Sequence, residues 1–154
     1  MSKQIVKSLM LVTLVVGLCL VATVKSANAQ VTGPLVTADI PFDFIIGDKT
    51  LPSGRYTVSS ATNDGQGLKI IARSGKAAAF RLSNPVTAKN EKLRPRLVFH
   101  RYGEQYFLVQ VWSRDHYGRQ LMQCKMERNL RQELASNKSK TGSAKVVEVA
   151  ALAR

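Results

Sequence analysis

The chain has 154 residues, of which 23 are Lys or Arg and 10 are Asp or Glu, so its formal net charge at pH 7 is +13. This positive charge favours anionic partners, and the length corresponds to a single domain. Two histidines and two cysteines exclude a disulfide framework and leave few ligands for a metal centre.

The first thirty residues have the three parts of a secretory signal peptide. Lys3 and Lys7 precede an uncharged apolar run over 9–24, and the small residues Ala27-Asn28-Ala29 form a cleavage site before Gln30. The run is shorter than the roughly 20 residues that cross a bilayer core, which argues against the alternative of an uncleaved anchor. We therefore expect cleavage between Ala29 and Gln30, so that 1–29 is a signal peptide.

The remaining segment, 30–154, is expected to be one β-rich domain. Removal of the three lysines of the leader lowers the formal charge from +13 to +10. Only Cys124 survives processing, so no intrachain disulfide can form. A buried inert thiol is the favoured interpretation of Cys124. A Cys124-linked dimer and a reactive thiol activated by Lys125 and Arg128 are the alternatives.

The first strand pattern covers 36–46, VTADIPFDFII. Apolar residues alternate along it, with Phe42, Phe44 and Ile46 on one side and Asp43 and Ile45 on the other. Pro41 lacks a ladder donor and therefore predicts an edge strand, a bulge or a break between two short strands. After a turn at LPSG, the segment RYTVSS (55–60) forms a further strand with Tyr56 and Val58 on one face.

Two more strands follow the reversal NDGQG (63–67). They are LKIIAR (68–73) and KAAAFRL (76–82), and the Ser74-Gly75 pair between them suits a tight hairpin. The polar segment 83–95 contains two prolines and is expected to be a surface loop. Its basic residues and the next one form the densest positive cluster of the β-rich part: Lys89, Lys92, Arg94 and Arg96.

The segments RLVFHRY (96–102) and QYFLVQVW (105–112) predict a β-hairpin. Both are rich in β-branched and aromatic residues, and Gly103-Glu104 fits a two-residue turn with glycine first. The register places His100 opposite Phe107, Phe99 opposite Leu108, and Arg101 opposite Tyr106. Both faces carry large apolar groups, so we expect a central pair covered on both sides.

After a polar stretch over 113–120, the period changes to that of a helix at about 121–136. Met122, Met126, Leu130 and Leu134 recur every four residues without Gly or Pro between them. This apolar stripe is expected to cover an end or a face of the β-structure. A final strand follows at about 145–152. The pattern predicts a mainly β fold, an antiparallel sandwich or small barrel of about seven strands with one C-terminal amphipathic helix.

No catalytic constellation is visible in the sequence. The histidines are His100 and His116, and neighbours such as Ser113 and Asp115 point in different directions on a strand, which weakens a triad. Neither the spacings of a zinc site nor a phosphate-binding glycine loop is present, so we expect no metal, no cofactor and no enzyme. The alternative is a small secreted hydrolase in which a histidine acts as acid and base.

Two groups of residues are candidates for binding. Exposed aromatic residues stack on sugar rings, whereas buried ones form core; the candidates are Tyr102, Tyr106, Trp112 and Tyr117. The basic candidates are Lys89, Lys92, Arg94 and Arg96 together with Lys125, Arg128 and Arg131. They favour anionic envelope components or polysaccharide rather than a specific nucleic acid.

Four segments occur in a characteristic order: IPFDFIIGDKTLPSGRYTV, AAAFRLSNPV, LVFHRYGEQYFL and VW. This pattern, from Ile40 to Trp112, resembles a family of small uncharacterised exported β-rich proteins found mainly in soil bacteria. The resemblance implies a β-rich domain in the periplasm or outside the cell, and it implies no catalytic or ligand residue. The sequence therefore predicts a non-catalytic envelope or extracellular module with a binding or structural role.

Overall fold

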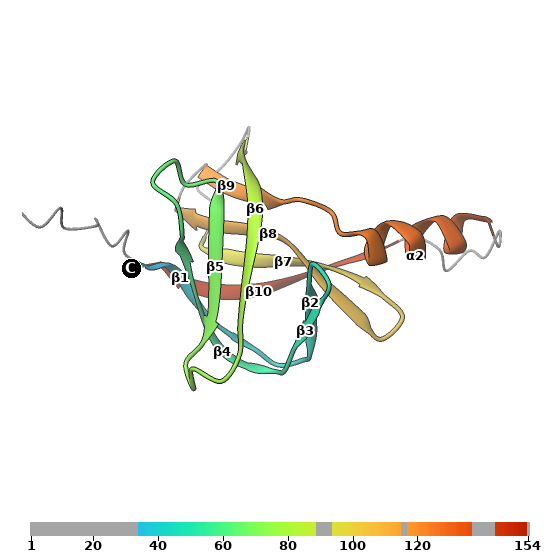
Figure 1. Cartoon of the computed structure of the whole chain (residues 1–154), viewed down its shortest axis with the longest axis horizontal. Helices are drawn as coiled ribbons and strands as arrows, with labels where there is room; N and C mark the ends of the chain where they lie inside the picture. The colour runs from blue at the N-terminus through green and yellow to red at the C-terminus, as the bar shows by residue number, and fades with distance from the viewer. Residues whose placement is uncertain (1–33, 89–93, 115–116, 137–143, 154) are drawn as a thin grey trace, which may run out of the picture. The chain divides into compact units, whose positions relative to one another are not determined.

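The structure is a computed structural model that describes residues 34–88, 94–114, 117–136 and 144–153 (Figure 1). The described residues belong to one compact unit. The described residues form ten strands and one helix: β1 (Pro34–Ile40), β2 (Phe44–Ile46), β3 (Lys49–Leu51), β4 (Gly54–Ser60), β5 (Gly67–Ala72), β6 (Ala78–Thr87), β7 (Arg96–Tyr102), β8 (Gln105–Arg114), β9 (Tyr117–Leu121), α2 (Lys125–Ser136) and β10 (Lys145–Ala153).

Eight of the strands close into an antiparallel barrel. Their order is β8-β7-β10-β1-β4-β5-β6-β9, and pairing of β9 with β8 closes the ring. In Figure 1, β5 and β6 cross over β7, β8 and β10, which belong to the opposite wall. The hairpin of β2 and β3 joins β8 through a parallel pairing of Ile45 with Phe107. Of the two expected architectures, the barrel is therefore the observed one.

Aromatic and aliphatic side chains from several strands fill the barrel interior. Because side chains alternate along a strand, every second residue of β1 and β4 points inward. Tyr56 and Val58 share the inward face of β4, in agreement with the expectation that they lie on one face. The ring of Phe44 makes edge-to-face contacts with those of Tyr56 and Phe99, at centroid distances of 5.0 and 5.7 Å. All three side chains are at most 1% exposed. Eight-stranded barrels either fill with side chains or hold one small ligand, and this one is packed.

Pro41 separates β1 from β2, which is the break among the three arrangements expected for it. Phe44 and Ile46 enter the barrel core, while Ile45 faces an outer cluster. The alternation expected for 42–46 is thus confirmed.

The β7–β8 hairpin has the expected register. His100 pairs with Phe107, Phe99 with Leu108, and Arg101 with Tyr106. Gly103 has a φ of 59°, a value that favours glycine at the first turn position. The register then shifts, because Val98 pairs with Gln110 and leaves Val109 as an extra residue. This bulge lets both Val109 and Gln110 face the outside of the barrel.

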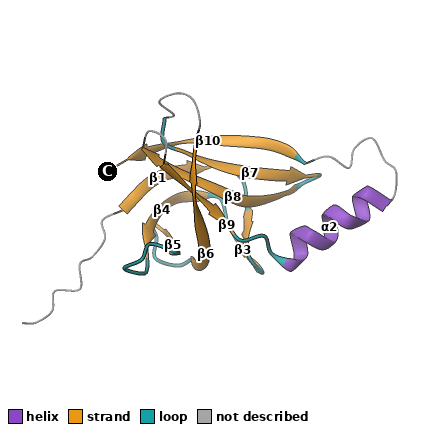
Figure 2. Cartoon of the chain, turned by 90° about the horizontal axis from the view of Figure 1, so that it is seen from above, coloured by secondary structure: helices purple, strands orange, loops and turns teal. Residues whose placement is uncertain are grey.

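A second apolar cluster lies on the outer face of β7 and β8, and residues of helix α2 pack against it. The helix itself extends past one end of the barrel (Figure 2). Leu130 and Leu134 pack against this cluster, as expected. Met122 and Met126 were wrongly assigned to the same stripe, since they are 52% and 42% exposed. The helix begins at Lys125 rather than near 121 because the preceding residues belong to β9 and its exit. The outer-face cluster consists of Ile45, Val98, Tyr102, Phe107, Val109, Trp112 and Cys124.

Two expectations about the polar segments were wrong. The first part of the expected loop at 83–95 continues β6 as far as Thr87, and the polar stretch after Trp112 contains β9. The two segments pair with each other, with Pro85 opposite Arg119. Pairing between β5 and β6 ends at Leu82, so the second half of β6 pairs with β9 alone. Pro85 is tolerated there because a strand with one unpaired edge can lack a backbone N–H donor on that edge. Within the described ranges, no helix has the length and apolar character needed to cross a bilayer.

Candidate functional site

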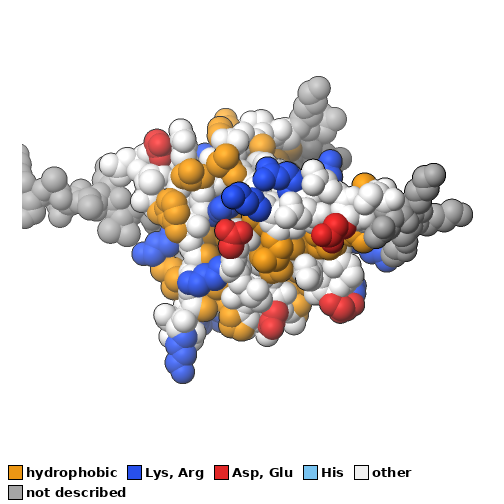
Figure 3. All heavy atoms as spheres, turned by 45° about the vertical axis from the view of Figure 1, so that its right-hand side comes forward, with side chains coloured by type: hydrophobic (Ala, Val, Ile, Leu, Met, Phe, Trp, Pro, Cys, Tyr) orange, Lys and Arg blue, Asp and Glu red, His pale blue; other side chains and the backbone are white. Residues whose placement is uncertain are grey.

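The basic candidates from the sequence do not gather into one patch. Lys89 and Lys92 lie outside the described residues. Lys125, Arg128 and Arg131 are exposed on α2, whereas Arg94 and Arg96 precede or begin β7. On the face drawn in Figure 3, basic side chains lie among acidic and apolar ones.

The aromatic candidates are also dispersed. Tyr102 and Trp112 are only 6% and 7% exposed and belong to the outer-face cluster. Tyr106 stacks on Phe42 at a centroid distance of 3.9 Å. Tyr117 is 72% exposed and thus the one of the four that is free to stack on a ligand. The structure therefore places three of these residues in packed surroundings and does not assemble a common platform.

A hydrogen-bonded pair of side chains connects α2 to the barrel. Nδ1 of His100 lies 2.8 Å from Oε1 of Glu127, whose side chain is 4% exposed. Glu127 lies in the first turn of α2, where the helix dipole favours a negative charge, and its backbone N–H donates to Sγ of Cys124 at 3.4 Å. Sequence reasoning missed Glu127, because a glutamate on a helix normally faces solvent.

The His100–Glu127 pair lines a hollow of about 180 Å³ between α2, β8 and β9, which also involves Gln120 and Arg131. Burial raises the pKa of Tyr102; the charge of Glu127 adds to this effect and that of Arg131 opposes it. A polar chain adjoins the hollow, since the Gln110 amide donates to Gln120 at 2.7 Å. The bulge in β8 places Gln110 on the outer face, where it can reach Gln120.

The other candidate histidine, His116, lies outside the described residues.

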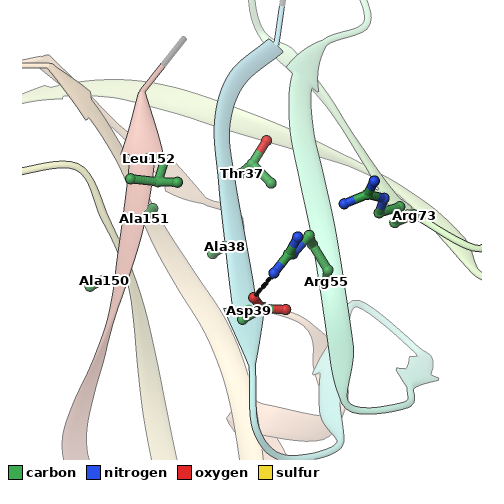
Figure 4. A pocket seen from close by; sticks show the side chains of 8 residues that line it. All are labelled: Thr37, Ala38, Asp39, Arg55, Arg73, Ala150, Ala151 and Leu152. Atoms are coloured by element: carbon green, nitrogen blue, oxygen red, sulfur yellow. Dashed lines mark hydrogen bonds and ion pairs between the residues drawn. The ribbon is translucent and has the colours of Figure 1, made fainter.

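A larger hollow, of about 360 Å³, lies on the outer face of the barrel where β1, β4 and β10 meet (Figure 4). The pairing of β1 with β10 ends at Ala38 and Ala151, so no ladder continues between these strands beyond that point. Ala150 has a small side chain that leaves room on the β10 side, where Leu152 is 74% exposed. This side of the hollow is therefore apolar.

The opposite side of the same hollow is charged. Nε and Nη2 of Arg55 donate to Oδ2 of Asp39 at 3.0 and 2.5 Å. The hydrogen bond from Arg55 lowers the pKa of Asp39, and the positive charges of Arg55 and Arg73 lower it further. Arg73 makes no ion pair with any carboxylate of the described residues, and its backbone N–H donates to the Arg55 carbonyl at 2.8 Å. Two guanidinium groups thus face one carboxylate, which leaves the hollow with net positive charge.

Another hollow on the outer face, of about 300 Å³, lies on the β7 side of β10. It shares Ala150 with the 360 Å³ hollow beside Arg55 and Asp39. Arg96 lies there over the ring of Trp112, with its Cζ 5.3 Å from the ring centroid, and its Nε is 3.2 Å from Oε1 of Glu148. This Nε has no hydrogen-bond acceptor in good geometry. Arg94 is exposed beside it. Arg96 is therefore held in place by neighbours, while Arg94 is accessible.

Cys124 is 5% exposed and packs in the outer-face cluster, as the favoured interpretation of an inert thiol predicts. The described residues contain no group of three or more side chains of the metal-binding type. The expected cleavage site at Ala29 and Gln30 lies outside the described residues. Comparison with protein families, with curated proteins and with solved structures finds no match to this chain.

Proposed function

We propose that the protein is an exported, non-catalytic binding module that attaches to anionic polymers of the cell envelope or its surroundings through the outer wall of its barrel. Export is supported by the leader pattern that ends at Ala29 and by the resemblance to exported β-rich proteins. The positive charge expected after cleavage supports an anionic partner. Export places the protein in the periplasm or outside the cell.

The observation that carries this proposal is the position of Arg73 in the outer hollow. Aromatic and aliphatic side chains of the described strands fill the barrel core, whereas the hollows described above lie on its outer side. The outer hollow combines an exposed leucine, Leu152, with a guanidinium group that pairs with no described carboxylate. Such a combination of apolar surface and a few polar groups is typical of ligand sites.

Retention on immobilised polysaccharides tests the proposal. The mature protein, starting at Gln30, is applied to an acidic polysaccharide matrix and to a neutral matrix of the same sugar class, over a series of salt concentrations. We expect retention on the acidic matrix and a steep loss with salt, because counterion release weakens binding to polyanions. Equal retention on both matrices, or retention that salt does not change, would contradict the proposal.

A hydrolase is the second candidate, and the His100–Glu127 pair is the observation in its favour. A carboxylate that holds Nδ1 of a histidine leaves Nε2 available as a general base, as in hydrolytic triads. The residues that line this hollow include no Ser, Thr or Cys within the described ranges, so a water molecule would be the nucleophile. In a screen of chromogenic esters, loss of any observed turnover in His100→Gln would support this function. Unchanged turnover would exclude it.

A further inference from the structure

We infer that the two outer hollows form one groove that binds a linear acidic polysaccharide across the strands, with anionic groups of the chain held at both ends. This inference rests on the proposed function and names the site and the ligand class. The groove is lined by two carboxylates and four arginines, with Ala150, Thr37 and Leu152 between or beside them: Glu148, Asp39, Arg94, Arg96, Arg55 and Arg73.

The strand register aligns these residues in one row around the barrel. Arg96 on β7 pairs with Ala150 on β10, and Asp39 on β1 pairs with Arg55 on β4. Arg73 follows β5, and its backbone N–H donates a hydrogen bond to the carbonyl of Arg55. All these side chains point outward, because their neighbours along each strand point into the core.

The length of the row follows from strand spacing. From Arg96 to Arg73 the row crosses four steps between adjacent strands, each of about 4.8 Å, so the two ends are separated by about 19 Å along the barrel wall. This distance exceeds the size of a single sugar ring. A ligand that contacts both ends must therefore be an oligomer or a polymer.

The chemistry of the row matches an acidic sugar chain. Each end offers one guanidinium group that pairs with no described carboxylate, Arg94 at one end and Arg73 at the other. Arg96 and Arg55 beside them already pair with Glu148 and Asp39. A guanidinium group binds a carboxylate with two hydrogen bonds. Between the two ends, Ala150 presents only a methyl group beside Asp39, which leaves room for a sugar ring on the β10 side of the row. Asp39 would repel a negative charge beside it, although Arg55 neutralises most of this effect.

The cationic residues of α2 do not belong to this groove. Arg128 and Arg131 lie on the helix, and Arg131 lines the separate hollow beside His100. The groove therefore includes only Arg94 and Arg96 of the basic set that the sequence indicated, and variants in the groove and on α2 separate the two locations.

The test uses oligogalacturonates of defined length as the acidic chain, with calorimetric titration of the mature protein at low salt. We expect weak binding of short oligomers and a step in affinity of about tenfold or more at the length that reaches both cationic ends. Methyl-esterified oligomers of the same lengths carry no charge and should show no step.

Three variants and their controls locate the site. Arg73→Gln removes the guanidinium at one end and should lower the affinity for long oligomers about tenfold, a loss typical of one charged hydrogen bond. Ala150→Phe should abolish the step by filling the middle of the groove, and Leu152→Gln should weaken binding less. Lys145→Gln and Val146→Gln are the controls for Arg73→Gln and Leu152→Gln, since they replace a cation and an aliphatic side chain by glutamine at exposed positions of β10 outside the groove.

The outcomes separate this inference from the proposed function. A length step that disappears in Arg73→Gln and Ala150→Phe but persists in the controls supports the groove. If oligogalacturonates bind without a step, or if the groove variants behave like Lys145→Gln, the groove inference is wrong while polyanion binding stands. Loss of binding in Arg128→Gln/Arg131→Gln alone would place the site on α2 instead. If neither the oligomers nor the acidic matrix bind, both proposals fail.

Discussion

Replacement of His100 by alanine leaves the Glu127 carboxylate buried without its partner. The side chain of Glu127 is 4% exposed and that of His100 is 34% exposed, so water reaches the pair from the histidine side only. A buried polar group without its hydrogen-bond partner costs about 1–3 kcal/mol, and more when it is charged, so we expect a loss of about 3 kcal/mol. For a domain of this size, Tm should fall by roughly 10 °C.

Urea denaturation followed by tryptophan fluorescence measures this loss. Trp112 is the only tryptophan of the chain, and it belongs to the cluster that α2 covers. Glu127→Gln retains an acceptor for the imidazole N–H and should cost only about 1 kcal/mol. Glu104→Gln is the control, because it removes a carboxylate that is 90% exposed in its pair with Arg101 and should change stability by less than about 0.5 kcal/mol.

The reasoning would be refuted if His100→Ala and Glu104→Gln destabilised the protein equally. That result would mean that Glu127 does not depend on His100 for its burial. Arg131 is a cation that lines the same hollow. The double variant His100→Ala/Arg131→Gln would show whether it takes over the role of partner.

Three further predictions test the packing. Gly118→Ala should destabilise the barrel by about 1–3 kcal/mol and shift the emission of Trp112, because the new Cβ would lie 2.5 Å from Cε3 of that ring. Burial raises the pKa of Tyr56 above its usual value of 10.0. The stability that this group contributes is therefore present below pH 10.0 and is lost as the pH rises through the folded-state pKa. In alkali, the urea midpoint of Tyr56→Phe should therefore fall less steeply than that of the unmodified protein. The thiol of Cys124 should stay inert to a thiol reagent until urea unfolds the protein, and rapid reaction of the folded protein would contradict its burial.

Local patterns were sufficient where neighbouring strands are consecutive in the chain. The register of β7 and β8 near their turn followed from a two-residue turn with glycine first. The missing N–H of Pro41 limited that position to an edge strand, a bulge or a break, and the break is observed. The same reasoning failed for β9 and the second half of β6, which are separated by β7 and β8 in the sequence. Their residues are polar and include Pro85, so no local signal distinguishes them from loops.

The candidate sites depend still more on tertiary structure. Glu127 and His100 are 27 residues apart, and Asp39 and Arg55 are 16 apart. Arg94 and Arg96 could be recognised as basic, but not the row that connects them with Arg73 across β10. Whether Tyr102 or Trp112 is exposed was equally open, because a strand with apolar groups on both faces gives no sign of which face a helix covers.

The sequence by itself determined that this is a basic, mainly β chain with a late amphipathic helix, because side-chain period, turn residues and charge are local properties. Only the tertiary structure decided that the strands close into a barrel, that α2 brings a carboxylate to His100, and that arginines from β4, β7 and the end of β5 share one outer row. These features arise from pairing between segments that are distant in the chain. Because the barrel is closed, the register of each strand pair depends on the registers of the others. No single segment of the sequence therefore determines the closed barrel.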